Sequence, residues 1–369
     1  MKALTAYSEK TDVSEAIEDI KNKFGTADLK AVVFFSSSNY PPEETAKLVK
    51  DEFPGATVIG CTTAGEIISG KMLKNSIVAM GLSSEMISDI SIEVVEDPAN
   101  TKNIEKAFES FGKYFGKSMS DLEFDEYVGI IIVDGLSNSE EKVMDRIGDL
   151  TNVTFIGGSA GDDVNFEKTW VFADGKAYTN AAVLAVLKPA KGFDIIKTQS
   201  FTALDKTMTA TKVNEETREV IEFNGKPAAE EYAAQLGVTV EKLPELFMSH
   251  PIGVITDDDI FVRSPQQIVD GSVVRFYCNI IEGMELNILK AGDIVSSTKD
   301  AVEDKKSELN NISGLINFHC ILRTLELEAT GKTTEYGAVF GDIPAIGFST
   351  YGEEYIGHIN QTSTMLVFK

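Results

Sequence analysis

The sequence predicts a mixed α/β fold with α+β character, in which parallel βαβ units are combined with antiparallel hairpins. Three observations support this prediction. Short apolar runs rich in β-branched and aromatic residues alternate with amphipathic helical stretches, the pattern of parallel strands joined by helical crossovers. Between residues 167 and 223, short strands separated by turn signals are typical of hairpins. A strand-to-loop sequence, Ile-Gly followed by hydroxyl-bearing residues, recurs along the chain.

The length and composition of the chain indicate two globular domains. Its 369 residues fit two domains at roughly 100–200 residues each. The hydrophobic content of 43% and charged content of 25% are ordinary for a globular protein. We expect the junction near the turn-forming sequence Asn-Gly-Lys-Pro at 224–227, which gives domains of residues 1–223 and 224–369.

The first βαβ unit lies near the beginning of the chain. Thr11 or Asp12 is placed to cap a helix that runs to about Phe24 with one apolar face. The apolar run 29–37 predicts a buried strand. Two prolines and an acidic first turn then indicate a helix within 38–53, and residues 56–60 form the next strand.

The same order recurs twice more. Residues 126–135 predict a strand, 137–150 a helix with a capping serine, and 153–158 another strand. After the hairpins, a helical stretch begins near Pro227, and β patterns follow from residue 251. The remaining expected elements are an exposed helix at 296–311, a buried strand at 314–323 that ends at Arg323, and a closing β segment at 343–368.

A strand-to-loop junction occurs in three copies. The sequence is VIGCTTAGE from residue 58, FIGGSAGD from residue 155 and AIGFSTYGE from residue 345. Each copy places an acid, Glu66, Asp162 or Glu353, directly after a glycine, and we expect equivalent turns. The similarity of the first and third copies predicts a pseudo-duplicated chain whose two halves face each other across a cleft.

These junctions are candidate ligand sites. Small residues after a strand allow a sharp bend that exposes main-chain N–H groups, and open α/β sheets bind ligands at the carboxyl edge of their parallel strands. The alternative is that the hydroxyl groups and acids only build the turns. The candidate residues are Thr62, Thr63, Glu66, Ser159, Ser349, Thr350 and Glu353.

Arg323 is the first candidate for binding a charged ligand. The chain has only five arginines, and this one ends a predicted buried strand. A guanidinium at the carboxyl edge of a sheet can bind a carboxylate through two hydrogen bonds, while Glu66 and Glu353 could bind an ammonium group. Together they would recognise an amino-acid-like zwitterion. The alternative is an internal ion pair between Arg323 and one of the acids.

Charge and cysteine content exclude several classes of protein. The net charge of −24 repels nucleic-acid phosphates and anionic membranes, and no cluster of Lys and Arg interrupts the acidic background. Three widely spaced cysteines fit neither a disulfide framework nor a zinc site. The longest apolar run, at 181–187, is too short to span a membrane, and no signal peptide is evident. We therefore expect a cytoplasmic protein.

The junctions and their surroundings resemble the FIST-domain family of prokaryotic signal-transduction proteins. The N-terminal FIST part is similar to residues 30–223, through VVFFSSS, VIGCTTAGEI, IGGSAGDD and VFADG…AAVLAVL. The C-terminal FIST part is similar to residues 224–355, through NGKPAAEEYAAQLG, HPIGV…VRSP, IEGMELNIL, FHCILR and IGFSTYGEEY. The family's Cys-x-x-Arg sequence matches Cys320 to Arg323, with Leu322 where the family usually has glycine.

The resemblance implies a sensory protein for small ligands such as amino acids or their derivatives. It adds Cys320 to the candidate ligand-binding residues. The resemblance also implies that this chain signals to a separate output protein, such as a kinase, a chemoreceptor or a cyclic-dinucleotide enzyme. Neither a metal nor a cofactor is expected.

Two other functions stay open. Some FIST relatives are described as haem-binding nitric-oxide sensors, and His250, which precedes Pro251, is the candidate haem ligand. The sequence GGSAG also matches the nucleophile elbow G-x-S-x-G of serine hydrolases, with Ser159 as the nucleophile. His319 or His358 would have to complete its triad, and the helix that should follow the serine is not evident.

Overall fold

The computed structural model describes residues 2–256 and 259–369 and separates the chain into two compact units. Unit 1 is built from Met1–Thr198, Thr298–His358 and Ser363–Lys369, and unit 2 from Gln199–Ser297 and Ile359–Thr362. Residue 224 lies inside unit 2, so these units differ from a division of the chain at that point. The reason is topological, because the chain returns from Thr298 onward to complete sheets of unit 1.

Unit 1 contains the same order of elements three times: strand, helix, strand, helical segment, strand, hairpin, strand. The first repeat comprises β1 (Leu4–Ser8), α1 (Val13–Phe24), β2 (Ala31–Ser37), α2 (Pro42–Glu52), β3 (Thr57–Thr63), β4 (Glu66–Ile68), β5 (Lys71–Leu73) and β6 (Ile77–Leu82). The second comprises β7 (Ile87–Glu96), α3 (Thr101–Phe115), β8 (Val128–Val133), α4 (Glu140–Leu150), β9 (Phe155–Ser159), β10 (Val171–Ala173), β11 (Lys176–Tyr178) and β12 (Ala181–Pro189). The third comprises β13 (Phe193–Thr198), α6 (Ile294–Leu309), β22 (Gly314–Cys320), α7 (Ile321–Thr330), α8 (Thr333–Ala338), β23 (Ala345–Thr350), β24 (Glu353–Tyr355), β25 (His358–Ile359) and β26 (Ser363–Phe368).

Each six-stranded sheet consists of four strands from one repeat and the two hairpin strands of another repeat. The orders are β1-β6-β2-β3-β10-β11, β7-β12-β8-β9-β24-β25 and β13-β26-β22-β23-β4-β5. A parallel pair lies at the centre of each sheet: β2 with β3, β8 with β9, and β22 with β23. The hairpin of every repeat joins the sheet of a different repeat, which closes a cycle. The mixed α/β class, with parallel units and antiparallel hairpins, is therefore confirmed.

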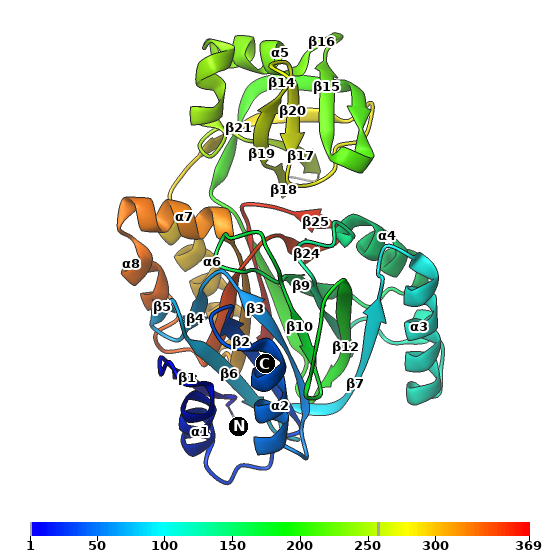
Figure 1. Ribbon diagram of the computed structural model, residues 1–369, viewed down its shortest axis with the longest axis vertical. Coiled ribbons are helices and arrows are strands. Elements are labelled where there is room, and N and C mark those ends of the chain that lie inside the picture. Colours follow the sequence, from blue (N-terminus) through cyan, green and yellow to red (C-terminus); the bar gives the residue numbers. More distant parts are fainter. Residues whose placement is uncertain (1, 257–258) are drawn as a thin grey trace. The chain divides into compact units, whose positions relative to one another are not determined.

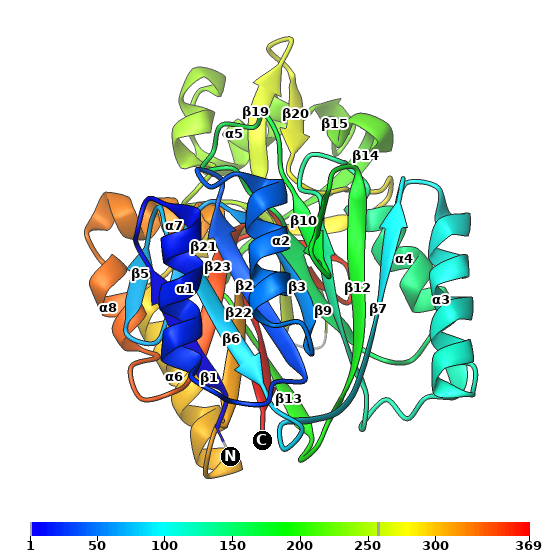
Figure 2. The ribbon, with the colours of Figure 1, turned by 60° about the horizontal axis from the view of Figure 1, so that its bottom comes forward.

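The three sheets share one apolar core and are covered by helices on their other faces. Phe35, Ile130 and Phe318 belong to this common core, one from the central strand of each sheet. Alternate residues of the same strands face outward, where Phe34 packs with α1 and α2 and Ile131 packs with α3 and α4. Figures 1 and 2 show α1 and α2 over the first sheet, α3 and α4 beside the second, and α6 to α8 beside the third.

Unit 2 is inserted into the third repeat, between β13 and the main part of α6. Its strands follow the order β18-β17-β21-β14-β15-β20-β19, with β16 paired to β15. They are β14 (Phe201–Asn214), β15 (Glu219–Phe223), β16 (Lys226–Pro227), β17 (Ile252–Thr256), β18 (Asp259–Arg263), β19 (Pro265–Val269), β20 (Val273–Phe276) and β21 (Glu285–Ala291). Helix α5 (Ala228–Leu236) contributes Tyr232 to the apolar core of this unit.

Two local predictions were wrong. The expected duplication into two facing halves is instead a set of three repeats, and the first and third junctions lie side by side within unit 1. The strand predicted to end at Arg323 ends at Cys320, where the chain turns into α7. The apolar residues Ile321 and Leu322 continue the pattern of the strand but belong to the helix, so Arg323 lies in its first turn.

Candidate functional site

The three junctions meet at the carboxyl ends of the parallel strands. Each lies at the end of a buried strand, β3, β9 or β23, and each contacts both of the others. The main-chain hydrogen bonds that join them run from Gly161 N to Thr62 O (2.9 Å), from Ser159 N to Gly352 O (2.9 Å) and from Ser349 N to Gly65 O (2.8 Å). The candidate residues Thr62, Thr63, Glu66, Ser159, Ser349, Thr350 and Glu353 are all buried.

At the first junction, the polar groups bind one another. Glu66 accepts hydrogen bonds from the Ser76 hydroxyl at 2.7 Å and the Ser76 main-chain N–H at 3.1 Å, and its other oxygen accepts one from Thr63. Burial raises the pKa of Glu66 to about 7, against the lowering effect of these hydrogen bonds. Thr62 Oγ1 accepts a hydrogen bond from Trp170 N at 2.9 Å. The carboxylate of Glu66 is thus occupied by its own chain.

At the second junction, Ser159 has carboxylate neighbours. Its hydroxyl lies 3.2 Å from Glu140 Oε1 and 3.4 Å from Glu354 Oε1. His358 Nδ1 lies 2.9 Å from the same oxygen of Glu354. Although burial alone would lower it, the charge of Glu354 raises the pKa of His358. A charged imidazole bound to Glu354 is not the neutral base that a nucleophilic serine needs, so this arrangement gives no support to the hydrolase alternative.

The acid of the second junction differs from those of the other two. Asp162 precedes a loop rather than a strand, and it accepts hydrogen bonds from the N–H groups of Phe166 (2.9 Å), Glu167 (2.7 Å) and Lys168 (2.9 Å). The loop carries Val164 at φ 67°, a conformation that β-branched residues rarely adopt. Asp162 therefore anchors a strained loop. The three junctions are equivalent in their strands, but the turn of the second junction differs from those of the first and third.

At the third junction, Thr350 and Ser349 connect the strands to helix α7. Thr350 Oγ1 donates to the carbonyl of Ser159 at 2.7 Å or to that of Gly352 at 2.6 Å. Ser349 Oγ lies 2.7 Å from Thr324 Oγ1, next to Arg323 in the first turn of α7. Glu353 begins β24, where its main chain pairs with β9.

Arg323 is buried, and its side chain makes one hydrogen bond to the described residues. The side chain is only 2% exposed, and Nη2 donates to Thr298 Oγ1 at 2.8 Å. In the part of the chain that the structure describes, neither Nε nor Nη1 has a hydrogen-bond partner. The internal ion pair considered from the sequence does not form. Cys320, three residues earlier, is buried and is not in a disulfide.

Two residues near Arg323, Thr298 and His319, were not identified from the sequence as parts of the candidate ligand site. Thr298 lies in α6, which was expected to be exposed, yet it is fully buried together with Ile294 and Val302. Their spacing of four residues marks one face of a helix and was the available signal. His319 lies on β22, four residues before Arg323, and was considered only as a catalytic base.

His250, the candidate haem ligand, lies in unit 2. Its Nδ1 is 2.9 Å from Ser249 Oγ, and burial, with a further contribution from Lys290, lowers its pKa. A hydroxyl partner on one nitrogen and partial burial fit an ordinary structural histidine as well as a ligand. Haem binding through His250 therefore stays a prediction.

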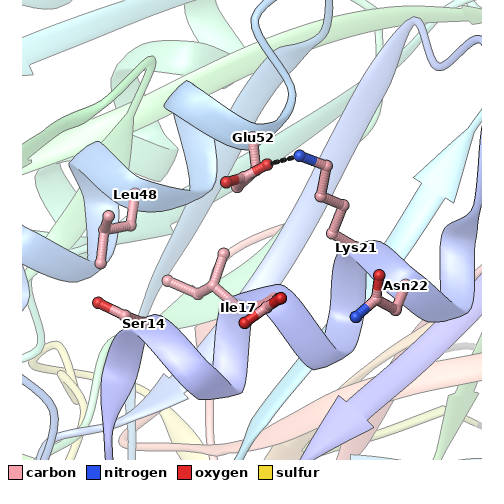
Figure 3. A pocket seen from close by; sticks show the side chains of 7 residues that line it. Ser14, Ile17, Lys21, Asn22, Leu48 and Glu52 are labelled. Carbon is pink, nitrogen blue, oxygen red and sulfur yellow. Dashed lines mark hydrogen bonds and ion pairs between the residues drawn. The ribbon is translucent and has the colours of Figure 1, made fainter.

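A surface groove lies apart from the three junctions. A groove between α1 and α2 of about 320 Å³ is lined by Ser14, Ile17, Glu18, Lys21, Asn22, Leu48 and Glu52. Lys21 and Glu52 form an ion pair across it (Figure 3).

Within residues 2–256 and 259–369, no three His, Cys, Asp or Glu side chains are grouped as metal ligands. None of the described helices combines the length and apolarity that a membrane span requires.

Two family models and one relative match the chain. The FIST N domain matches residues 30–226, and the FIST C domain matches residues 228–355. An uncharacterized protein from Methanocaldococcus jannaschii is 25% identical over 331 residues, which cover 80% of this chain. The chain spans 60% of that relative's length.

Proposed function

The chain belongs to the FIST family, and from this premise we propose that it is a sensor of small carboxylate ligands in which Arg323 binds the carboxylate. FIST domains are associated with sensory roles in signal transduction. Amino acids and related carboxylates are the class that we propose for the ligand. A kinase, a chemoreceptor or a cyclic-dinucleotide enzyme in the cytoplasm is the proposed recipient of the signal.

One observation carries this proposal, the buried guanidinium of Arg323 with two nitrogens unpartnered. A buried charge is stabilised only when it is paired and its hydrogen-bonding groups are satisfied. Here the chain supplies one hydroxyl acceptor, that of Thr298, and Arg323 takes part in no ion pair among the described residues. A bound carboxylate would supply both the missing negative charge and two acceptor oxygens.

The geometry favours a carboxylate over a ligand that is recognised only through its ammonium group. Glu66 is one of the two acids, with Glu353, that were candidate partners for an ammonium group, and its oxygens are occupied by Thr63 and Ser76. We therefore expect the affinity to depend mainly on the ligand's carboxylate. Acetate and succinate should bind measurably, and amino acids should bind better only where other side chains contact them.

The test is a thermal-shift screen of the whole chain with amino acids, acetate, succinate and lactate, followed by calorimetry of each compound that shifts the melting temperature. A ligand at about one hundred times its dissociation constant should stabilise the fold by ~2.7 kcal/mol. Arg323→Met should abolish the shift while the protein stays folded by circular dichroism.

Arg146→Met is the matched control. Arg146 also belongs to unit 1, but it forms ion pairs with Glu105 and Asp149 on the surface, so its loss should leave the ligand response unchanged. If Arg323→Met responds to the carboxylates as the wild-type protein does, or if none of them stabilises the wild-type protein, the proposal is wrong.

A further inference from the structure

We propose that His319 is a second ligand-binding residue, a neutral imidazole whose Nε2–H donates to the same anionic group that Arg323 binds. This inference rests on the proposed function and adds a recognition element that the sequence did not show. Its basis is a buried polar network beneath helices α7 and α8. The network is specific to the third repeat.

Strand register makes the three repeats directly comparable. The glycine of each Ile-Gly junction pairs with one residue of the neighbouring strand: Gly60 with Phe34, Gly157 with Ile131, and Gly347 with Asn317. Two residues later, the corresponding positions are Ser36, Val133 and His319. The third repeat thus has Asn and His on the helix-covered face, where the second repeat has Ile and Val.

Polar residues at such positions are unfavourable unless they are fully hydrogen-bonded. Asn317 and His319 are both 0% exposed, as is Tyr336 of α8. The apolar side chains of the second repeat show that the fold itself does not require polar groups here. A polar cluster at this place therefore indicates a role other than packing.

The hydrogen bonds run in one direction and end at His319. Ser363 Oγ donates to Asn317 Oδ1 at 2.6 Å, and Asn317 Nδ2 donates to the Tyr336 hydroxyl at 3.1 Å. The Tyr336 hydroxyl can then donate its own proton to His319 Nδ1 at 2.8 Å or to Ser363 Oγ at 3.5 Å, and the shorter contact favours His319. A neutral imidazole that accepts at Nδ1 carries its proton on Nε2.

That Nε2–H is left without an acceptor. His319 Nε2 is buried and has no hydrogen-bond partner in the described chain, like Nε and Nη1 of Arg323. Burial, reinforced by the charge of Arg323, lowers the pKa of His319 well below its ordinary value, so the ring is neutral at physiological pH. The charged and titratable groups around it are Arg323 from α7 and Tyr336 from α8.

The unpartnered groups of the two side chains are all donors. Arg323 Nε and Nη1 and His319 Nε2 carry four N–H bonds, two of them on Nη1, and offer no acceptor. Nε–H and Nη1–H lie on opposite edges of the guanidinium, so one ligand group would accept from His319 Nε2–H and from one edge of Arg323. Beside a buried cation, the acceptor that fits best is an ionised oxyanion, such as a carboxylate or a phosphate. An alcohol, an amide or an ammonium group would bring a donor that finds no partner among these groups.

The first test is the state of the imidazole itself. The chain has three histidines, so ¹⁵N spectra assigned with His319→Gln can follow each ring. The proposal expects the Nε2–H tautomer of His319, with an uncharged ring at neutral pH. Addition of acetate or inorganic phosphate should shift the Nε2–H resonance. An Nδ1–H tautomer, a charged ring at pH 6, or no response to either anion would overturn it.

The second test is the affinity of acetate and phosphate by calorimetry. His319→Leu should weaken binding about tenfold or more, whereas His319→Gln, whose side-chain N–H can replace Nε2–H, should stay within about threefold. Tyr336→Phe removes the group that fixes the tautomer and should weaken binding to an intermediate extent. Tyr232→Phe, which removes a buried hydroxyl from unit 2, is its matched control.

The outcomes separate this inference from the proposed function. If Arg323→Met abolishes binding but His319→Leu and His319→Gln bind like the wild-type protein, Arg323 alone recognises the anion and the role of His319 is wrong. If Arg323→Met has no effect either, the proposed function fails as well. Phosphate binding without acetate binding would retain the donor site and change the ligand to a phosphate compound.

Discussion

The guanidinium of Arg323 is held at a single nitrogen, by the hydroxyl of Thr298 2.8 Å from Nη2. Thr298 lies in α6 and Arg323 in the first turn of α7, so the bond joins two helices on the outer face of the third sheet. Among the described residues, this buried cation has no ion-pair partner, and its Nε and Nη1 have no hydrogen-bond partner. The first prediction follows from this buried charge without an ion-pair partner.

Arg323→Met should not destabilise the ligand-free protein. Replacing a poorly paired buried charge by an apolar side chain of similar size is often neutral or stabilising by ~1–4 kcal/mol. We expect the free energy of unfolding in urea to be unchanged or higher than that of the wild-type protein. Arg275→Met, which breaks an ion pair with Glu219, should lower it. A loss of more than ~2 kcal/mol in Arg323→Met would show that the guanidinium has a stabilising partner.

Glu66→Gln should raise stability at neutral pH but not in acid. The pKa of Glu66 in the folded protein is about 7, above its ordinary value of 4.5, so folding favours the protonated form. Its contribution is fully favourable below pH 4.5 and is lost as the pH rises toward 7. Gln keeps the shape of the protonated acid, and the variant should therefore be more stable by ~1–3 kcal/mol at pH 8 and equal at pH 4. The same difference at both pH values would contradict this assignment.

Alanine at the Ile-Gly glycines should destabilise all three repeats. An added Cβ would lie 2.0 Å from Phe34 O at Gly60, 1.7 Å from Ile131 O at Gly157 and 2.3 Å from Asn317 O at Gly347. Each contact is with main chain of the neighbouring strand, which cannot move aside without disturbing the sheet. We expect each variant to lose about 3 kcal/mol, measured by chemical denaturation.

Gly55→Ala is the control for these variants, because no atom lies within 4 Å of its added Cβ. It should change stability by less than ~1 kcal/mol. If only one or two of the three glycines proved sensitive, the junctions would not be structurally equivalent.

Asp162→Ala should open the loop that follows the second junction. The carboxylate accepts main-chain hydrogen bonds from Phe166, Glu167 and Lys168, and its loss would leave those N–H groups without their acceptor. Trypsin should then cleave after Lys168 much faster than in the wild-type protein. Asp163→Ala, which removes only contacts with the hydroxyls of Ser37 and Ser38, should be cleaved slowly. Equal rates in the two variants would exclude the anchoring role of Asp162.

Local structure was predictable where short-range chemistry decides it. Asp12 caps α1 as expected, with Oδ1 accepting from Glu15 N at 3.0 Å. Ser139 does precede α4, but its hydroxyl binds Ser137 rather than the helix. The end of β22 was misplaced because no glycine or proline marks the turn at Cys320, and apolar residues continue on both sides.

The arrangement of the repeats could not be predicted, because it depends on pairing between distant segments. The junction sequences showed that three turns resemble one another, but not that each hairpin joins another repeat's sheet.

The candidate ligand site was predictable in part. Arg323 was conspicuous as a rare arginine, whereas Asn317 and His319 lay within an apolar run that predicts only a strand. Their relation to Tyr336 exists only after α8 packs on the sheet.

The cyclic exchange of hairpins also constrains the order in which the chain can fold during synthesis. One edge of β9 stays unpaired until β24 has been synthesised. In the same way, β13 has no partner strand until β26, which ends at Phe368, has been synthesised. The chain as far as Phe368 must therefore leave the ribosome before the second and third sheets are complete, and such late, long-range pairing slows folding. Until then the exposed strand edges are open to pairing with other chains. The last seventeen residues, 353–369, thus close the fold, and their removal would leave two sheets unfinished.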